Sequence, residues 1–117
     1  MKQKVNQIRD LAIIEKTLNK SKVGILAYRD DKGKINQAVT PFVYVDKNIF
    51  LFYDKDENFD RIMFNSNVNF SVLKEEKISK ENVLDFEPAY RFLQIWCDGI
   101  IKNIDDSKIK VDQVTFL

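Results

Sequence analysis

Residues Lys22 to Asn69 read KVGILAYRDDKGKINQAVTPFVYVDKNIFLFYDKDENFDRIMFNSNVN and carry the strongest structural signal of the chain. An apolar run from Val23 ends in the charged turn Asp30–Gly33, and the turn Asp46–Asn48 separates two further apolar runs. Apolar runs with strand-like alternation, bounded by turn residues, are typical of antiparallel strands. We therefore expect strands over residues 22–29, 35–45 and 49–53, with Pro41 marking a bend, a bulge or an edge position because proline donates no ladder hydrogen bond.

The segment after the third strand, Asp54 to Ser66, has the pattern of a short helix. Phe59, Ile62 and Met63 lie near helical spacing, and an aspartate at its start can accept backbone hydrogen bonds. A fourth strand is then expected over residues 68–73.

The flanking segments complete the expected fold. Asn6 can cap a first helix that ends near Lys20, and residues 74–88 read as a long polar connection. Two more strands are expected over residues 91–102 and 108–117, with a bulge or a close approach at Gly99. The sequence thus predicts one mainly β domain over residues 1–117, a six-stranded antiparallel barrel with two short helices.

Composition excludes several classes of function. The 117 residues include 19 basic and 18 acidic side chains, whereas a nucleic-acid-binding protein usually has a basic excess gathered on one face. No stretch approaches the length of a membrane span or of a signal-peptide core, so we expect a cytoplasmic protein without membrane contact. Cys97 is the single cysteine and is expected to be a small buried apolar residue.

The chain contains no histidine. Histidine is the commonest general base and the commonest metal ligand of proteins. Zinc chemistry, Ser-His or Cys-His catalysis and histidine-ligated haem are therefore not favoured. No other residue stands out as a general acid or base.

The order of these elements, with Thr40-Pro41 in the second strand and Asn65-x-x-Val68 after the second helix, resembles the pyridoxamine 5'-phosphate oxidase-like FMN-binding split-barrel family. The resemblance covers about residues 8–103 and is strongest to the small members of that family. It implies a homodimer that holds FMN in a groove at its interface, and a flavin-dependent oxidoreductase acting on an unknown small molecule.

The resemblance also implies which side chains contact the cofactor. These residues are Thr40, Pro41, Phe42, Tyr53, Asn58, Arg61 and Trp96. Tyr53 and Trp96 have structural alternatives, as a strand aromatic and as an anchor of the dimer interface. No catalytic residue is implied.

The expected phosphate site departs from the family pattern. Flavin-binding members place Ser-Arg-Lys or Ser-x-Lys at the start of the second helix, where this chain has Asp56-Glu57-Asn58. Two carboxylates repel a phosphate, which leaves the helix N-terminus, Asn58 and Arg61 as donors. The Arg and Lys that the oxidase carries on its second strand correspond to Ala38 and Val43.

Two alternatives to FMN-dependent chemistry therefore stay open. The chain is then either a split barrel that has lost the phosphate site and serves as a ligand-binding or interaction module, with F420 or haem as possible flat ligands, or a structural dimer without a ligand.

Overall fold

The computed structural model describes residues 2–7, 10–54, 59, 61–78 and 89–117. In chain order, the elements are β1 (Lys2–Gln7), α1 (Leu11–Lys20), β2 (Val23–Arg29), β3 (Ile35–Val45), β4 (Asn48–Phe52), β5 (Asn67–Ile78), β6 (Ala89–Asn103) and β7 (Lys108–Phe116). Within the described residues, α1 is the one helix.

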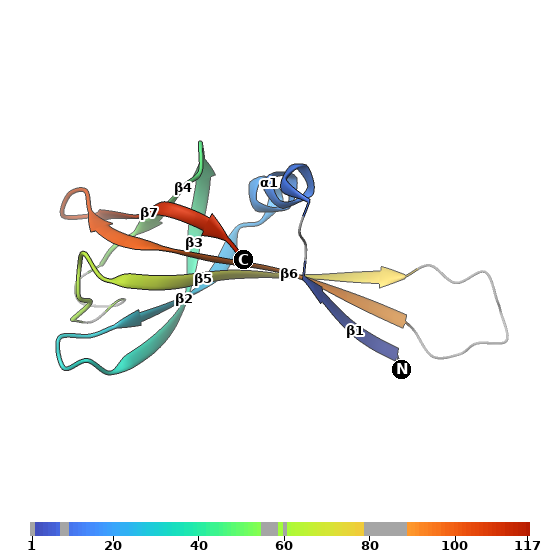
Figure 1. Ribbon diagram of the computed structural model, residues 1–117, viewed down its shortest axis with the longest axis horizontal. Helices are drawn as coiled ribbons and strands as arrows, with labels where there is room; N and C mark the ends of the chain where they lie inside the picture. The colour runs from blue at the N-terminus through green and yellow to red at the C-terminus, as the bar shows by residue number, and fades with distance from the viewer. Residues whose placement is uncertain (1, 8–9, 55–58, 60, 79–88) are drawn as a thin grey trace, which may run out of the picture.

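Six of the strands close into a barrel. The hydrogen-bonded order is β6-β5-β2-β3-β4-β7, and a further pairing of β6 with β7 joins the two ends. Every neighbouring pair in this ring is antiparallel. The predicted six-stranded antiparallel barrel is confirmed, and the β-strands make up most of the fold (Figure 1).

Strand β3 changes partner at Pro41. Residues up to Pro41 pair with β2, and residues from Phe42 onward pair with β4. Phe42 itself donates its N–H to the Lys22 carbonyl at 3.1 Å. The missing N–H of Pro41 thus falls at the junction between two ladders, where the loss of one ladder bond disturbs the sheet least.

The barrel interior follows from alternation along each strand. One face of every barrel strand points inward, and the buried apolar side chains form one cluster together with Ile14 and Leu18 of α1. Phe42 and Phe70 pack edge-on with ring centroids 4.9 Å apart. Burial of apolar area on this scale is the main stabilising term of the fold.

The first helix begins later than the sequence pattern predicts. Its N-cap is Asp10, not Asn6, because the Asp10 carboxylate accepts the N–H groups of Ala12 and Ile13 at 2.9 and 3.3 Å. Asn6 belongs to β1, which pairs in parallel with β6 through Lys2 opposite Ala89. Figure 1 shows β1 and the adjoining ends of β5 and β6 extending away from the barrel on one side.

The expected helix over Asp54–Ser66 is wrong in its described part. Phe59, Arg61 and Asn65 have φ values of 52°, 55° and 65°, which a right-handed helix does not allow. Ile62 instead forms an antiparallel bridge with Asp30, and Met63 donates its N–H to the Arg29 carbonyl at 2.9 Å. Tertiary pairing with the end of β2 overrides the local helical spacing. Residues 55–58 and 60 lie outside the described residues.

Gly99 lies at the predicted irregularity. The β6–β7 register shifts between Asp98 and Ile100. A Cβ on Gly99 would lie 2.7 Å from the Asp112 carbonyl oxygen, so the strands approach more closely here than a side chain permits. Both the predicted bulge and the predicted close approach are confirmed.

Candidate functional site

A groove of about 240 Å³ lies on the outer face of β3, β4 and β7. Its lining residues are Val43, Phe50, Leu51, Phe52 and Lys108. Antiparallel pairing places Val43 opposite Phe50 and Phe52 opposite Lys108. Side chains directly opposite each other in such a pair are within contact range. This surface, the aromatic groove, therefore combines two phenyl rings with one ammonium group.

Alternation within β4 explains why two phenylalanines face outward. Ile49 and Leu51 fill the barrel interior, so the residues between and after them lie on the opposite face. Phe50 is half-buried, and Phe52 remains 55% exposed. A cluster of exposed apolar side chains of this kind marks a surface suited to a ligand or a partner.

The charges at the groove come from β7. Lys108 and Lys110 both face outward because Ile109 lies in the interior between them. Lys110 lies opposite Phe50, and its Nζ is 4.0 Å from Asp112 Oδ1. Lys108, on β7, lies beside the end of β4 from which the chain continues into residues 53–54.

A carboxylate also stands near this end of the groove. The Ser107 N–H and hydroxyl donate to Asp105 Oδ1 at 2.8 and 3.0 Å, and these bonds, with a smaller contribution from Lys108, hold the pKa of Asp105 below its ordinary value. Asp105 is therefore ionised at neutral pH, with its charge partly satisfied inside its own turn.

A second exposed apolar surface lies across β3, β2, β5 and β6. In register, Val39 lies opposite Ile25, Ile25 opposite Ser71, and Ser71 opposite Trp96. Val39 is 72% exposed and Trp96 43% exposed. The adjacent pair Val23 and Pro41 is also exposed and widens the surface. We call these six residues the Trp96 face.

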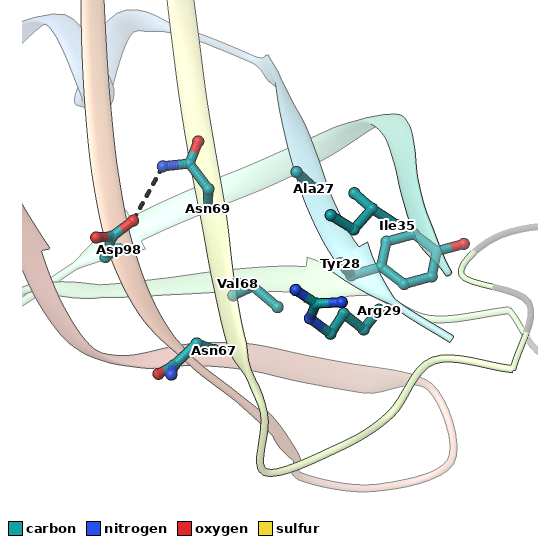
Figure 2. A pocket seen from close by; sticks show the side chains of 8 residues that line it. All are labelled: Ala27, Tyr28, Arg29, Ile35, Asn67, Val68, Asn69 and Asp98. Atoms are coloured by element: carbon teal, nitrogen blue, oxygen red, sulfur yellow. Dashed lines mark hydrogen bonds between the residues drawn. The ribbon is translucent and has the colours of Figure 1, made fainter. Parts of the chain in front are cut away.

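The outward positions next to the Trp96 face on β2, β5 and β6 form a more polar surface. A cleft of about 520 Å³ is lined by Ala27, Tyr28, Arg29, Ile35, Asn67, Val68, Asn69 and Asp98. Figure 2 shows Asp98 bonded to Asn69 on one side of the cleft and Arg29 on the other. Asn69 Nδ2 donates to Asp98 Oδ1 at 3.0 Å, and Arg29 Nη1 donates to the Gly33 carbonyl at 3.1 Å. Each of these charged groups thus already has a partner within the protein.

The expected cofactor contacts on β3 divide between the two sides of the sheet. Thr40 is 1% exposed, and its hydroxyl donates to the Pro41 carbonyl at 3.1 Å. Phe42 is buried against Phe70. Both side chains therefore lie inside the barrel, whereas Pro41 lies on the outer face beside Val23.

Tyr53 is a half-buried member of an aromatic cluster. Its ring stacks on Phe59 with centroids 6.5 Å apart and meets Phe64 edge-on at 5.8 Å. Its backbone N–H donates to the Ser107 carbonyl at 2.8 Å. Tyr53 thereby fixes the end of β4 against the turn before β7.

Arg61 and Trp96 lie on different parts of the molecule. Arg61 is exposed at the corner where its carbonyl accepts the Asp31 N–H at 2.9 Å, and Trp96 belongs to the Trp96 face. Asn58, the remaining expected contact, lies outside the described residues. The structure does not gather the expected contacts among the described residues into one cluster.

The residues that the sequence reasoning missed are Phe50, Phe52 and Lys108. Alternation in β4 was available as a signal that its phenylalanines face outward. The pairing of β4 with β7, which brings Lys108 beside Phe52, joins segments more than 50 residues apart and leaves no local pattern.

Two buried titratable groups belong to the interior. Burial raises the pKa of the Cys97 thiol to about 12, with a smaller effect of Asp98, and Cys97 Sγ donates to the Phe70 carbonyl at 3.2 Å. Burial also raises the pKa of Tyr44, and the charge of Glu15 adds to the effect. The burial expected for Cys97 is confirmed.

Among the described residues, no three His, Cys, Asp or Glu side chains are grouped as metal ligands. The single helix in that part of the chain is too short to cross a membrane.

Other solved structures share this fold, among them the following two. The FAD binding protein from Mycobacterium smegmatis aligns with a TM-score of 0.62 and 13% identity, over 92% of this chain and 93% of that one. A "putative 5-nitroimidazole antibiotic resistance protein" from Bacteroides thetaiotaomicron VPI-5482 aligns with a TM-score of 0.68 and 16% identity, over 93% of this chain and 84% of that one. No family model matches the sequence, and no curated protein matches it. At these identities the two structures establish the barrel fold that the chain has in common with them.

Proposed function

We propose that the protein binds FMN with the flavin ring in the aromatic groove and transfers electrons between the flavin and a small molecule. The observation that carries this proposal is the pairing of Phe52 with Lys108 beside Val43 and Phe50. FMN has a flat aromatic ring system and an anionic phosphate tail. The groove offers phenyl and aliphatic surfaces to the ring and one cation to the tail.

The fold supports the same proposal. One solved structure with this barrel is that of an FAD binding protein, so a barrel of this shape is compatible with a bound flavin. A bound flavin supplies the redox chemistry itself, and the polypeptide binds the flavin, orients it and excludes water. The absence of histidine is therefore no obstacle to this function.

The size of the groove supports a site completed by a second copy of the chain. Ligand pockets typically enclose roughly 300–1,000 Å³, whereas the groove of one protomer has about 240 Å³ and is open. We propose a homodimer whose interface includes the Trp96 face, because exposed apolar side chains gather there on β2, β3 and β6.

A non-catalytic binding module is the second candidate. It is favoured by Phe59, Arg61 and Asn65, whose positive φ values remove helical structure from the described part of the segment that would carry the phosphate site. The carboxylates of Asp56 and Glu57 in the sequence favour it as well. In this case the barrel binds a different ligand or a protein through the same surfaces.

A visible absorption spectrum after gel filtration tests the proposal. The purified protein is incubated separately with FMN and with FAD, and free flavin is removed on the column. Flavin absorbance that elutes with the protein supports flavin binding, and the two incubations show which flavin is retained. Colourless protein after both incubations contradicts the proposal and favours the binding module.

Substitution of Phe52 tests whether the flavin binds in the aromatic groove. Phe52→Ala should weaken flavin binding about 2- to 12-fold, because an aromatic contact contributes roughly 0.5–1.5 kcal/mol. Ile104→Ala is the matched control, since Ile104 is another exposed apolar residue and does not line the groove. Equal affinities of the two variants would move the flavin away from the aromatic groove.

A further inference from the structure

The β4–β7 ladder places a cation at one end of the aromatic groove. Lys108 lies opposite Phe52, where β4 ends and the chain continues to Tyr53 and Asp54. The Tyr53 N–H and the Ser107 carbonyl bond at 2.8 Å and hold this end of the two strands together. The ammonium group of Lys108 is therefore carried by a paired strand at one end of the groove.

This position matters because the segment after β4 is rich in carboxylates. Asp54, Asp56, Glu57 and Asp60 follow within seven residues of sequence. A phosphate bound in the groove needs a compensating positive charge, and the sequence that directly follows β4 is mostly acidic. Lysine is a common phosphate ligand that acts as a compact point charge.

Other cations in the described residues are less well placed. Lys110 faces the same side of β7, but it lies opposite Phe50 and does not line the groove. Arg61 lies at the corner next to Asp31, at the end of β2. Among the residues that line the groove, Lys108 carries the one positive charge.

We infer that Lys108 binds the phosphate of FMN and makes the aromatic groove selective for a phosphorylated flavin over riboflavin. The inference rests on the proposed flavin binding. It assigns the phosphate contact to β7 in place of the residues at the start of the expected second helix.

The experiment compares two ligands that differ only in the phosphate. Dissociation constants for FMN and for riboflavin are measured by flavin fluorescence with the wild-type protein, Lys108→Gln, Lys108→Arg and Lys110→Gln. Lys108→Gln should weaken FMN binding about tenfold and leave riboflavin binding unchanged, because a hydrogen bond to a charged group is lost. Lys108→Arg should retain most of the FMN affinity, and Lys110→Gln should change the ratio of the two constants less than twofold.

The same measurements include the outcomes that overturn the inference. It fails if wild-type protein binds FMN and riboflavin equally, or if Lys108→Gln weakens both ligands alike. It also fails if Arg61→Gln, measured in parallel, removes the preference for FMN and Lys108→Gln does not. In these three cases flavin binding itself stands, whereas a protein that binds neither ligand contradicts the proposed function together with this inference.

Discussion

Gly24 of β2 lies against the ring of Phe70 on β5. A methyl group at Gly24 would lie 2.8 Å from Phe70 Cε2 and 2.9 Å from the Ser71 carbonyl oxygen. Phe70 has no exposed surface and packs against Phe42. The absence of a side chain at Gly24 therefore provides the space that one of the largest interior side chains occupies.

Gly24→Ala should lower the free energy of unfolding by about 1–3 kcal/mol, because it overpacks the interior. Urea denaturation measures the change. Gly24→Ala should lower the free energy of unfolding less in a Phe70→Leu background than in the wild-type protein. If Gly24→Ala lowers the free energy of unfolding equally in both backgrounds, contact with the Phe70 ring is not the cause of the loss.

Gly33→Ala is a useful comparison for that variant. Gly33 has φ of 77°, and a Cβ there would meet nothing within 4 Å. Its replacement should cost about 1–2 kcal/mol through the backbone alone. Phe70→Leu should leave this cost unchanged.

Asp30 makes stability depend on pH in the acid range. Its carboxylate accepts the N–H groups of Lys34 and Lys32 at 2.9 Å and the Asn36 side-chain amide at 3.0 Å. These bonds, with that from Lys34 first, lower the pKa of Asp30 from its ordinary value of 3.8. Because the folded-state pKa is the lower one, the ionised carboxylate stabilises the fold above about pH 3.8, and this contribution is lost as pH falls through the folded-state pKa.

Asp30→Asn should therefore be less stable than wild-type protein at pH 7, and the difference should shrink below pH 3.8. Urea denaturation across this range measures it. Asp31→Asn is the matched control, because its side chain takes part in none of these bonds. A stability difference for Asp30→Asn that stays constant with pH would exclude the carboxylate bonds as its source.

Cys97 should be unreactive in the folded protein. The buried thiol, with its pKa raised to about 12, supplies very little thiolate, and thiolate is the reactive form. At pH 8, a thiol reagent should label native protein far more slowly than protein in guanidinium chloride, where one thiol per chain reacts. Equal labelling rates would mean that the interior opens readily around β6.

The same shift predicts a loss of stability in alkali. The folded-state pKa of Cys97 lies above the unfolded value near 9, so its contribution is complete below pH 9 and is lost as pH rises toward 12. Cys97→Ala should remove this part of the alkaline dependence. If the stabilities of the wild-type protein and of Cys97→Ala fall in parallel as pH rises, Cys97 is not the source of the alkaline loss.

Trp96→Asp should convert the proposed dimer into a monomer. An aspartate in the Trp96 face would carry an unpaired charge into the interface, which is strongly unfavourable. Light scattering coupled to gel filtration measures the mass, and Leu11→Asp on α1 is a control at another exposed apolar position. A wild-type protein of monomer mass would exclude this interface.

Trp96 also reports on the interface directly, because it is the single tryptophan of the chain. Its fluorescence emission should shift to the red when the dimer is diluted. Emission that does not change with concentration, in a protein of dimer mass, would place the interface elsewhere.

The strands of the barrel could be predicted from the sequence because each of them is a local pattern. Turn residues bound each apolar run, and the long β3 tolerates Pro41 at its change of partner. The predicted helix over Asp54–Ser66 was wrong because a contact distant in sequence decides its backbone. Phe59 and Ile62 do become buried, but the pairing of Ile62 with Asp30, distant in sequence, decides the backbone.

The sequence of β1 gives almost no indication that it forms a strand. Its sequence, KQKVNQ, is mostly polar, and its partner lies more than 80 residues later in parallel register. The candidate site was partly hidden for the same reason, since Phe52 and Lys108 meet only through β4 and β7. Sequence patterns indicated where the strands lie, whereas long-range pairing decided which residues are neighbours on the surface.

Closure of the barrel by β7 has a consequence for folding. β7 bonds to β4 on one side and to β6 on the other, so β4 remains a free edge until residues 108–116 are in place. During synthesis, the two-strand hairpins would emerge from the ribosome before the strand that joins them into a ring. Non-local pairing of this kind is slow, and an unpaired edge is prone to aggregate. The interval between emergence of β4 and docking of β7 is therefore the time at which a chaperone would protect this protein most.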